Sequence, residues 1–183
     1  MIFALENLND LYMDIKRPGD GPMHAGTFLQ RANWKHIQRI SLRGAIRLYY
    51  SNDSQENAKI LRDFYTRHPT LKAISFRAPK LLLPLCLIKG ILPNLTSVDC
   101  RATTLPRIYD YLPYHILQQL ECLLTSAAID VDVLAGMKSL KIFSGQVEGA
   151  KLDEIISALP NIERLEILPS LNITDLVGLL IKL

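Results

Sequence analysis

The sequence contains little cysteine, little net charge and no long hydrophobic run, and each of these absences argues against a class of protein. Its three cysteines are an odd number without a CxxC pair, which argues against both a disulfide framework and a cysteine-rich zinc site. The formal net charge is only +3 over 183 residues, too small to indicate a polyanionic partner. The longest apolar run, residues 81–88, is far shorter than the roughly 20 residues of a membrane span. We therefore expect neither nucleic acid nor a membrane as partner.

A secretory signal is missing as well. A signal peptide has a basic segment before its apolar stretch, and the first residues, MIFALENLND, have none. Together with the unpaired cysteines this favours a reducing compartment, and we expect a cytoplasmic or nuclear protein. By contrast, 49% of the residues are hydrophobic, enough to bury a sizeable core. We expect a single domain over residues 1–183.

The apolar residues recur in a fixed frame. Residues 92–100 (LPNLTSVDC) define it, with apolar residues at the first, fourth, seventh and ninth positions, and six further segments begin at residues 5, 34, 68, 117, 134 and 159. Only His68 and Thr125 break the apolar rule. The fourth positions of the seven frames lie 29, 34, 24, 25, 17 and 25 residues apart, close to the period of about 20 to 29 residues of leucine-rich repeats.

The frame has a physical meaning. Its seventh and ninth positions are two residues apart, so in an extended segment their side chains point to one face and each frame predicts a short, half-buried strand. Between the frames, residues 51–69 and 149–160 have apolar residues at helical spacing and a proline at or near the end, which predicts two helices. Stacked strand and helix units share one core. We therefore expect an α/β leucine-rich-repeat solenoid, right-handed, with about seven irregular repeats, parallel strands on the concave side and helices on the convex side.

A doubly wound parallel sheet is the alternative for alternating strands and helices. Its strands are covered on both faces and read as nearly continuous Val/Ile runs, whereas the strands predicted here alternate. No glycine-rich turn follows any of them. The sequence therefore favours the solenoid.

Four segments carry a resemblance to a known family: HPTLKAISF (68–76), LPNLTSVDC (92–100), MKSLKIFSG (137–145) and LPNIERLEI (159–167). They resemble the leucine-rich-repeat region of F-box proteins and of the ribonuclease-inhibitor-like superfamily, over essentially the whole chain. The resemblance implies the substrate-recognition region of a ubiquitin-ligase adaptor, with ligase subunits bound through flanking sequence.

The chain also departs from that family pattern. No F-box precedes the first repeat, and the Asn or Cys expected after each strand is replaced, so that no asparagine ladder is expected. The last residues, TDLVGLLIKL, are predicted to form a helix without a following strand. We therefore expect an irregular solenoid that is a fragment of a longer array.

Motifs that carry catalysis or bind metal were sought and not found. The four histidines are scattered, and HExxH, GxSxG and GxxxxGK[ST] motifs are missing. His68 is interpreted as a structural histidine, residues 16–22 as a turn, and Asp130 with Asp132 as a loop or helix entry. We expect no enzymatic activity, no cofactor and no metal. A hydrolase-like domain on an irregular α/β scaffold and a stand-alone structural or sensor repeat are the alternatives to a binding scaffold.

The frame also predicts which residues face the concave side, because they alternate with the core positions. Three arginines from successive strands share one column there, and several apolar residues lie toward the C-terminal half. We expect a protein partner with an extended acidic or phosphorylated segment and an apolar anchor. The predicted binding residues are Arg43, Arg77, Arg101, Leu124, Lys141, Phe143 and Leu168.

Overall fold

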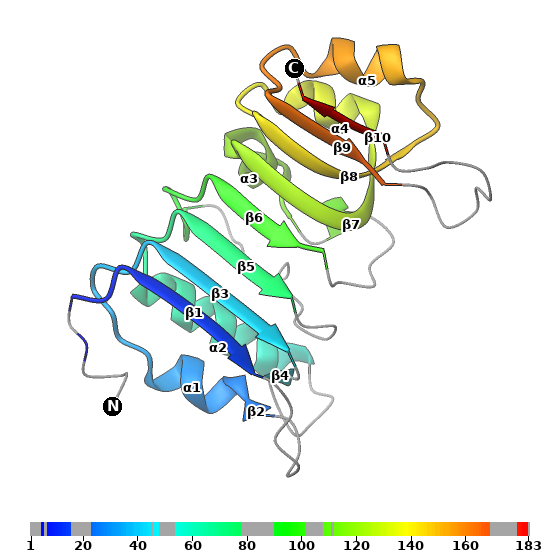
Figure 1. Cartoon of the computed structure of the whole chain (residues 1–183). Coiled ribbons are helices and arrows are strands. Elements are labelled where there is room, and N and C mark those ends of the chain that lie inside the picture. Colours follow the sequence, from blue (N-terminus) through cyan, green and yellow to red (C-terminus); the bar gives the residue numbers. More distant parts are fainter. Residues whose placement is uncertain are drawn as a thin grey trace.

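The computed structural model describes Leu5 and residues 7–15, 23–44, 46–47, 54–77, 90–101, 108–110, 112–168 and 179–182. In these residues, seven parallel strands form one continuous sheet (Figure 1). They are β1 (Asp10–Ile15), β3 (Arg39–Gly44), β5 (Ala73–Arg77), β6 (Ser97–Cys100), β7 (Cys122–Asp130), β8 (Ile142–Glu148) and β9 (Arg164–Ile167). Each strand pairs with the next one along the chain. The described strands therefore lack the reversal of strand order that defines a doubly wound sheet.

The last described strand differs from the predicted helix. β10 (Leu179–Lys182) pairs with β9 in antiparallel register, opposite Arg164 to Ile167. The helix prediction for this segment was therefore wrong for residues 179–182, because a short apolar run such as Leu179–Ile181 suits a strand as well as a helix. Two short strands, β2 (Met23–His24) and β4 (Ile46–Arg47), form a separate parallel pair that was not predicted.

The two predicted helices are confirmed as α2 (Ser54–Arg67) and α5 (Leu152–Ala158). Three shorter helices and a 3-10 turn were not predicted: α1 (Ala25–Arg31), α3 (Tyr114–Gln119), α4 (Val131–Gly136) and η3 (Ile108–Asp110). α4 begins directly after Asp130, as a helix entry requires. Helix α1 packs against α2 and α4 against α5, and Figure 1 shows α2, α3 and α4 behind the sheet. We call the opposite side the open face.

The strand register confirms the repeating frame in six segments and corrects it in one. The seventh frame positions are aligned across the sheet as Leu11, Ile40, Ile74, Val98, Leu123, Phe143 and Leu165. Phe143 takes the place predicted for Leu140, so the frame of β8 begins at residue 137 and not at residue 134. With this correction the irregular spacing of 17 becomes 20 and the next becomes 22.

A ladder of backbone hydrogen bonds joins each repeat to the next. The carbonyl of the residue just before the strand accepts two N–H groups from the following repeat, first seen where Asn9 O accepts from Gln38 N at 2.7 Å and Arg39 N at 3.0 Å. The same pair of bonds recurs at the carbonyls of Gln38, Lys72, Thr96, Glu121 and Lys141. These bonds satisfy one backbone carbonyl at the start of each strand and join the stacked repeats without any side chain.

In several repeats the turn before the strand is tied to the preceding repeat by a polar side chain. Asn94 Nδ2 donates to the Pro69 carbonyl at 3.1 Å, and Asn161 Nδ2 donates to the Lys138 carbonyl at 2.8 Å. Thr70 Oγ1 donates to the Ile37 carbonyl at 2.7 Å from the same position of its repeat. The recurring LPN and HPT sequences therefore have a structural role, which is to hold the stacked turns together.

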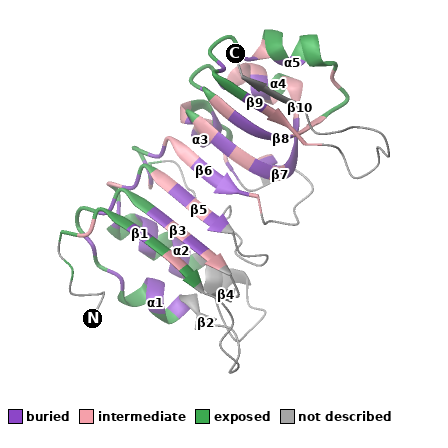
Figure 2. Ribbon diagram, viewed as in Figure 1, coloured by how far each residue is buried: buried purple, intermediate pink, exposed green. Residues whose placement is uncertain are grey.

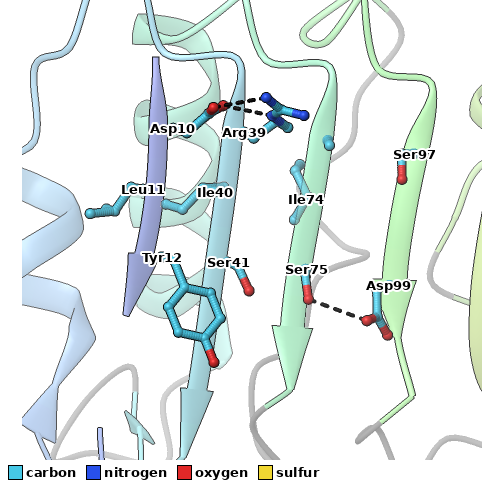
Figure 3. A pocket seen from close by; sticks show the side chains of 11 residues that line it. Asp10, Leu11, Tyr12, Arg39, Ile40, Ser41, Ile74, Ser75, Ser97 and Asp99 are labelled. Atoms are coloured by element: carbon cyan, nitrogen blue, oxygen red, sulfur yellow. Dashed lines mark hydrogen bonds and ion pairs between the residues drawn. The ribbon is translucent and has the colours of Figure 1, made fainter. Parts of the chain in front are cut away.

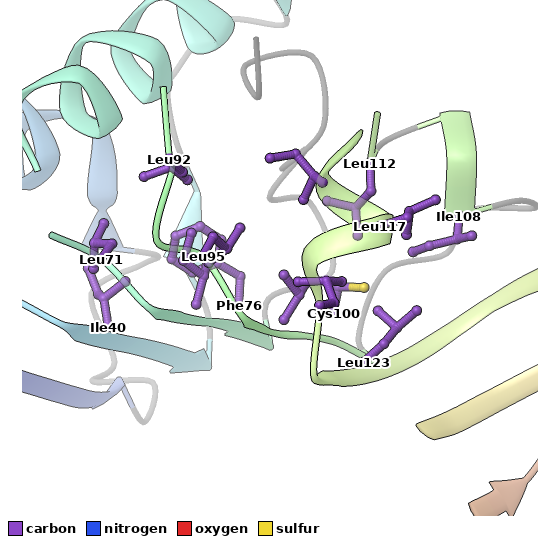
Figure 4. Close-up of a cluster of buried hydrophobic side chains, with 14 of the residues drawn as sticks. Ile40, Leu71, Phe76, Leu92, Leu95, Cys100, Ile108, Leu112, Leu117 and Leu123 are labelled. Carbon is purple, nitrogen blue, oxygen red and sulfur yellow. The ribbon is translucent and has the colours of Figure 1, made fainter. Parts of the chain in front are cut away.

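The core lies between the sheet and the helices. Figure 4 shows Ile40, Leu71, Leu95, Leu117 and Leu123 meeting from successive repeats, and all of them are buried. In Figure 2 buried and accessible residues alternate along the central strands. One continuous core therefore spans the repeats, as stacking of units too small to bury their own apolar faces requires.

His68 is confirmed as a structural histidine. Its side chain has 0% exposure and its ring lies 4.3 Å from that of Phe64 and 5.9 Å from that of Trp34, centroid to centroid. Nδ1 lies 2.6 Å from the Phe64 carbonyl and Nε2 lies 3.0 Å from the backbone N of Trp34. The neutral tautomer with a proton on Nδ1 satisfies both contacts.

Candidate protein-binding face

The open face is built from residues that alternate with the core positions. Its central column is aligned in register as Tyr12, Ser41, Ser75, Asp99, Leu124, Ser144 and Glu166. Small side chains occupy this column at the neighbouring strands β3 and β5, between Tyr12 on β1 and Asp99 on β6, whereas the small Ser144 on β8 is buried. A hollow is therefore expected over β3 and β5, where the sheet itself forms the floor.

The structure has a trough of about 340 Å³ at this place. Its floor is made of Ser41, Ala73, Ser75 and Ser97, which come from three neighbouring strands (Figure 3). Three serine hydroxyls can each donate and accept a hydrogen bond, and the apolar groups between them can pack against a ligand. The volume is at the lower end of that of small-molecule sites and suits a few side chains of a bound chain.

The end of the trough at β1 and β3 is made by an ion pair. Arg39 Nε donates to Asp10 Oδ1 at 2.6 Å and a terminal Arg39 nitrogen donates to Oδ2 at 2.8 Å. This two-bonded contact lowers the pKa of Asp10 and raises that of Arg39, mainly through the hydrogen bonds. Both side chains are exposed, so the pair orients the two residues and adds little to the free energy of folding.

A second, more buried ion pair makes the opposite end. Arg101 Nε donates to Asp99 Oδ1 and a terminal Arg101 nitrogen donates to Oδ2, both at 3.1 Å. The Ser75 hydroxyl donates to the same carboxylate at 3.4 Å. Asp99 has 8% exposure, and its hydrogen bonds raise the pKa of Arg101. Both ends of the trough are therefore ordered before any partner binds.

The predicted arginine column is only partly confirmed. Arg43 and Arg77 are aligned in register on β3 and β5, although the side chain of Arg77 lies outside the described residues. Arg101 follows the end of β6, and its guanidinium turns back to Asp99. Arg101 therefore does not complete the predicted column as a strand residue, because it lies past the end of β6 and binds the carboxylate of Asp99.

The predicted apolar patch is contradicted at its centre. Phe143 has 0% exposure and lies in the core beside Leu123. Lys141 precedes β8, and its Nζ binds Glu121 Oε2 at 3.2 Å. The three-residue shift of the frame explains the burial of Phe143, because it moves the inward seventh position from Leu140 to Phe143. Leu124 and Leu168 are partly buried rather than exposed.

The corrected frame identifies residues that the sequence interpretation missed. Ile142 lies on the open face next to Cys122 in register and is partly accessible. Burial raises the pKa of the Cys122 thiol, so this cysteine is a poor nucleophile at neutral pH. Ser144, one column away, is buried. The open face is therefore filled over β7 and β8 and hollow over β3 and β5.

No group of three or more His, Cys, Asp or Glu side chains in the described part of the chain could hold a metal ion. None of the helices described there is long and apolar enough to cross a membrane.

The comparisons with known proteins add no assignment. No family model, no curated protein and no solved structure matches the chain. The assignment of a function therefore depends on the repeats and on the trough.

Proposed function

We propose that the chain is a non-catalytic, protein-binding scaffold built as a right-handed leucine-rich-repeat solenoid. The strands follow one another in chain order, and each repeat is joined to the next by the same backbone ladder. An array of this kind places successive strands side by side and leaves one long face open for a partner. These features support the solenoid and its use as a binding surface.

The observation that carries the proposal is the trough over β3 and β5. Its small-residue floor lies between two ends that are already fixed by the Asp10–Arg39 and Asp99–Arg101 ion pairs. A site whose side chains are held in place loses less conformational freedom on binding. An extended segment of a partner protein can lay side chains into this trough and use the serine hydroxyls for hydrogen bonds.

The resemblance of the repeat frame to F-box proteins extends the proposal. In that reading the trough recognises a substrate protein, and the chain belongs to a ubiquitin-ligase adaptor of the cytoplasm or nucleus. The half-buried Cys122 is a free cysteine, which fits such a reducing compartment.

Filling the trough tests the binding role. Ser75→Trp places a large side chain on the floor, whereas Lys59→Trp places the same side chain on the exposed surface of α2, behind the sheet. We expect wild-type and Lys59→Trp protein to capture the same partner from a reduced cell extract and Ser75→Trp to lose it. Circular dichroism melts of all three proteins control for folding.

The ligase role is tested in cells with the same two variants, because a ubiquitin-ligase adaptor promotes the degradation of the protein it recognises. The captured partner should accumulate when Ser75→Trp replaces the wild type, and its level should not change with Lys59→Trp. Equal capture of one partner by the folded Ser75→Trp and Lys59→Trp proteins would remove the trough from the proposal. A captured partner whose level in cells does not change with Ser75→Trp would leave a binding scaffold and remove the adaptor.

A further inference from the structure

The surface of the trough mixes carbon atoms with hydrogen-bonding groups. Among the described residues that line it, Leu11, Ile40 and Ile74 are buried, because they occupy the inward seventh position of the frame. The other lining residues are three serines, two aspartates, an arginine, an alanine and a tyrosine. Such a surface suits a ligand that is itself mixed, with C–H and O–H groups on the same ring.

The charged groups at both ends of the trough are matched within the protein. Arg39 donates to both oxygens of Asp10, and Arg101 donates to both oxygens of Asp99. A charged group of a ligand would lose its water there and would meet a carboxylate or guanidinium that already has a counterion. A paired carboxylate still has lone pairs, and the ion pair uses two of the five N–H donors of Arg39. The ends therefore favour neutral hydroxyl groups over the acidic segment that the sequence predicted.

Tyr12 adds an aromatic face at one side of the trough. It is 58% exposed, and Figure 3 shows its ring beside Ser41, which is its partner in register on β3. Arg43 lies over one face of the ring, with its guanidinium carbon 5.4 Å from the ring centre, so the exposed area belongs to the other face and the edge. The negative face of an aromatic ring attracts the partly positive C–H groups on one side of a sugar ring. Tyr12 and the serine floor can therefore contact the C–H and O–H groups of one sugar at the same time.

The Ser75 hydroxyl has a fixed direction as well. It donates to Asp99 at 3.4 Å, so its oxygen is presented to a ligand as an acceptor. Ser75 lies two strands from Tyr12, which places the two about 10 Å apart at the backbone. The trough lies on the open face of the sheet, so a small ligand stays partly in water and is held weakly by itself. Additional affinity has to come from the chain that carries the ligand.

We propose that the trough binds a neutral sugar that is attached to a side chain of the partner protein. This inference rests on the proposed function and names the chemistry of its partner. The sugar ring lies against the exposed face of Tyr12. Its hydroxyl groups donate to Asp10 and Ser75 and accept from Arg39, and the segment that carries the sugar runs along the open face.

Simple sugars test the site without any partner. In ¹H–¹⁵N spectra of the full chain, we expect the amide signals of Tyr12, Ser41 and Ser75 to shift and saturate with at least one neutral methyl glycoside from a panel of the common hexoses and N-acetylhexosamines. The signal of Ser144, on the filled part of the open face, should stay in place. Sorbitol has the hydroxyl groups without the ring, and the methyl glycoside of glucuronic acid adds a charge. Both should bind more weakly than the best neutral sugar.

Matched substitutions locate the site. Tyr12→Leu removes the aromatic face and should weaken binding of that sugar by roughly three- to tenfold. Tyr114→Leu changes a similarly exposed tyrosine on α3, behind the sheet, and should leave the affinity unchanged. Tyr12→Phe keeps the ring and should retain most of the affinity. Circular dichroism melts of the three variants control for folding.

Shifts at Tyr12 that are no larger with any sugar of the panel than with sorbitol would overturn the inference, and so would an equal loss of affinity in Tyr12→Leu and Tyr114→Leu. Neither result affects the proposed function, which stands if Ser75→Trp still loses its partner. An excess of the bound sugar should also release the partner captured by the wild type, and a partner that stays bound would overturn its being the source of the sugar. Sugar binding at Tyr12 together with unchanged capture by the folded Ser75→Trp protein would instead overturn the proposed function and leave the trough as a site for a free sugar.

Discussion

Among the single residues, His68 contributes to the fold through a specific set of buried contacts. It occupies a frame position where the other repeats mostly have leucine or another apolar residue, and it caps two backbone groups that would otherwise lie buried and unpaired. Burial is the main cause that lowers the pKa of His68 below its ordinary value of 6.5, with the nearby Arg67 charge adding to the effect. The folded protein therefore favours the neutral form of the His68 imidazole.

A pH dependence follows from this pKa shift. The unfolded chain takes up a proton on His68 at about pH 6.5, whereas the folded chain does so only at a lower pH, so acidification favours the unfolded state. The free energy of unfolding should fall as the pH drops below 6.5 and until it passes the lowered pKa of the folded state. Above pH 6.5 this histidine should contribute no slope.

Urea unfolding of the wild type and of His68→Gln between pH 5 and pH 8 measures the effect. We expect a steeper loss of stability toward low pH in the wild type than in His68→Gln. His36→Gln, which alters an exposed histidine, should keep the wild-type slope. Parallel curves for wild type and His68→Gln would show that His68 does not drive the acid response.

At the level of the element, β8 shows how two neighbouring residues set the register of a strand. Gly145 occupies the inward position that is Thr125 in β7 and Ile167 in β9. A Cβ added at Gly145 would lie 2.8 Å from a ring carbon of Phe143 and 2.9 Å from Thr125 Cγ2. The phenyl ring of Phe143 therefore fills the space that the glycine leaves.

Gly145→Ala should consequently destabilise the protein by about 1–3 kcal/mol through overpacking. In a Phe143→Leu background the shorter side chain vacates that space, so the same change should cost less than half as much, a coupling that a double-mutant cycle measures. Ser144→Ala is the control, because the Ser144 hydroxyl is buried without a hydrogen-bond partner among the described residues; its loss should be nearly neutral. Additive effects of Gly145→Ala and Phe143→Leu would contradict this packing.

The same strand shows how far sequence reasoning reached. All seven parallel strands were predicted, because alternation of apolar residues and recurring turns are local signals. At residues 134–143, however, Leu134, Met137, Leu140 and Phe143 are all apolar and spaced by three. The frame that begins at Met137 therefore fits at its first three apolar positions and departs from the rule only at its ninth, which is Gly145. The spacing of 17 residues was the available sign that the chosen frame was wrong.

The site was less predictable than the fold. The trough forms where small residues of β3, β5 and β6 are neighbours across the sheet. Which residues are neighbours depends on the strand register, and the register is set by the stacking of the strands. The contact between Arg101 and Asp99 forms because β6 ends at Cys100, so that Arg101 lies outside the strand. The sequence pattern does not show where the strand ends. The short helices α3 and α4, with six residues each, have too few turns to give a helical period in the sequence.

The whole molecule is an array in which each repeat touches mainly its neighbours, and this makes truncation informative. Removing residues 1–33 takes away β1 and α1 with the buried Leu11, Phe28 and Leu29. It keeps Trp34 with its bond to His68, and the ladder from Gln38 onward. The remaining strands β3 to β9 retain their order and most of their core.

We therefore expect the chain of residues 34–183 to remain folded but less stable, with a lower melting temperature and a smaller urea m-value because less surface is buried. Leu140→Asp should act very differently. Leu140 is buried in the middle of the stack, and an unpaired charge placed there should unfold several repeats at once. Circular dichroism melts compare the two variants, and hydrogen exchange of β6 to β9 shows whether those strands keep their protection in the truncated chain. A truncated chain without any cooperative melt would mean that the first repeat is essential to the whole sheet, and would contradict the repeat architecture proposed for it.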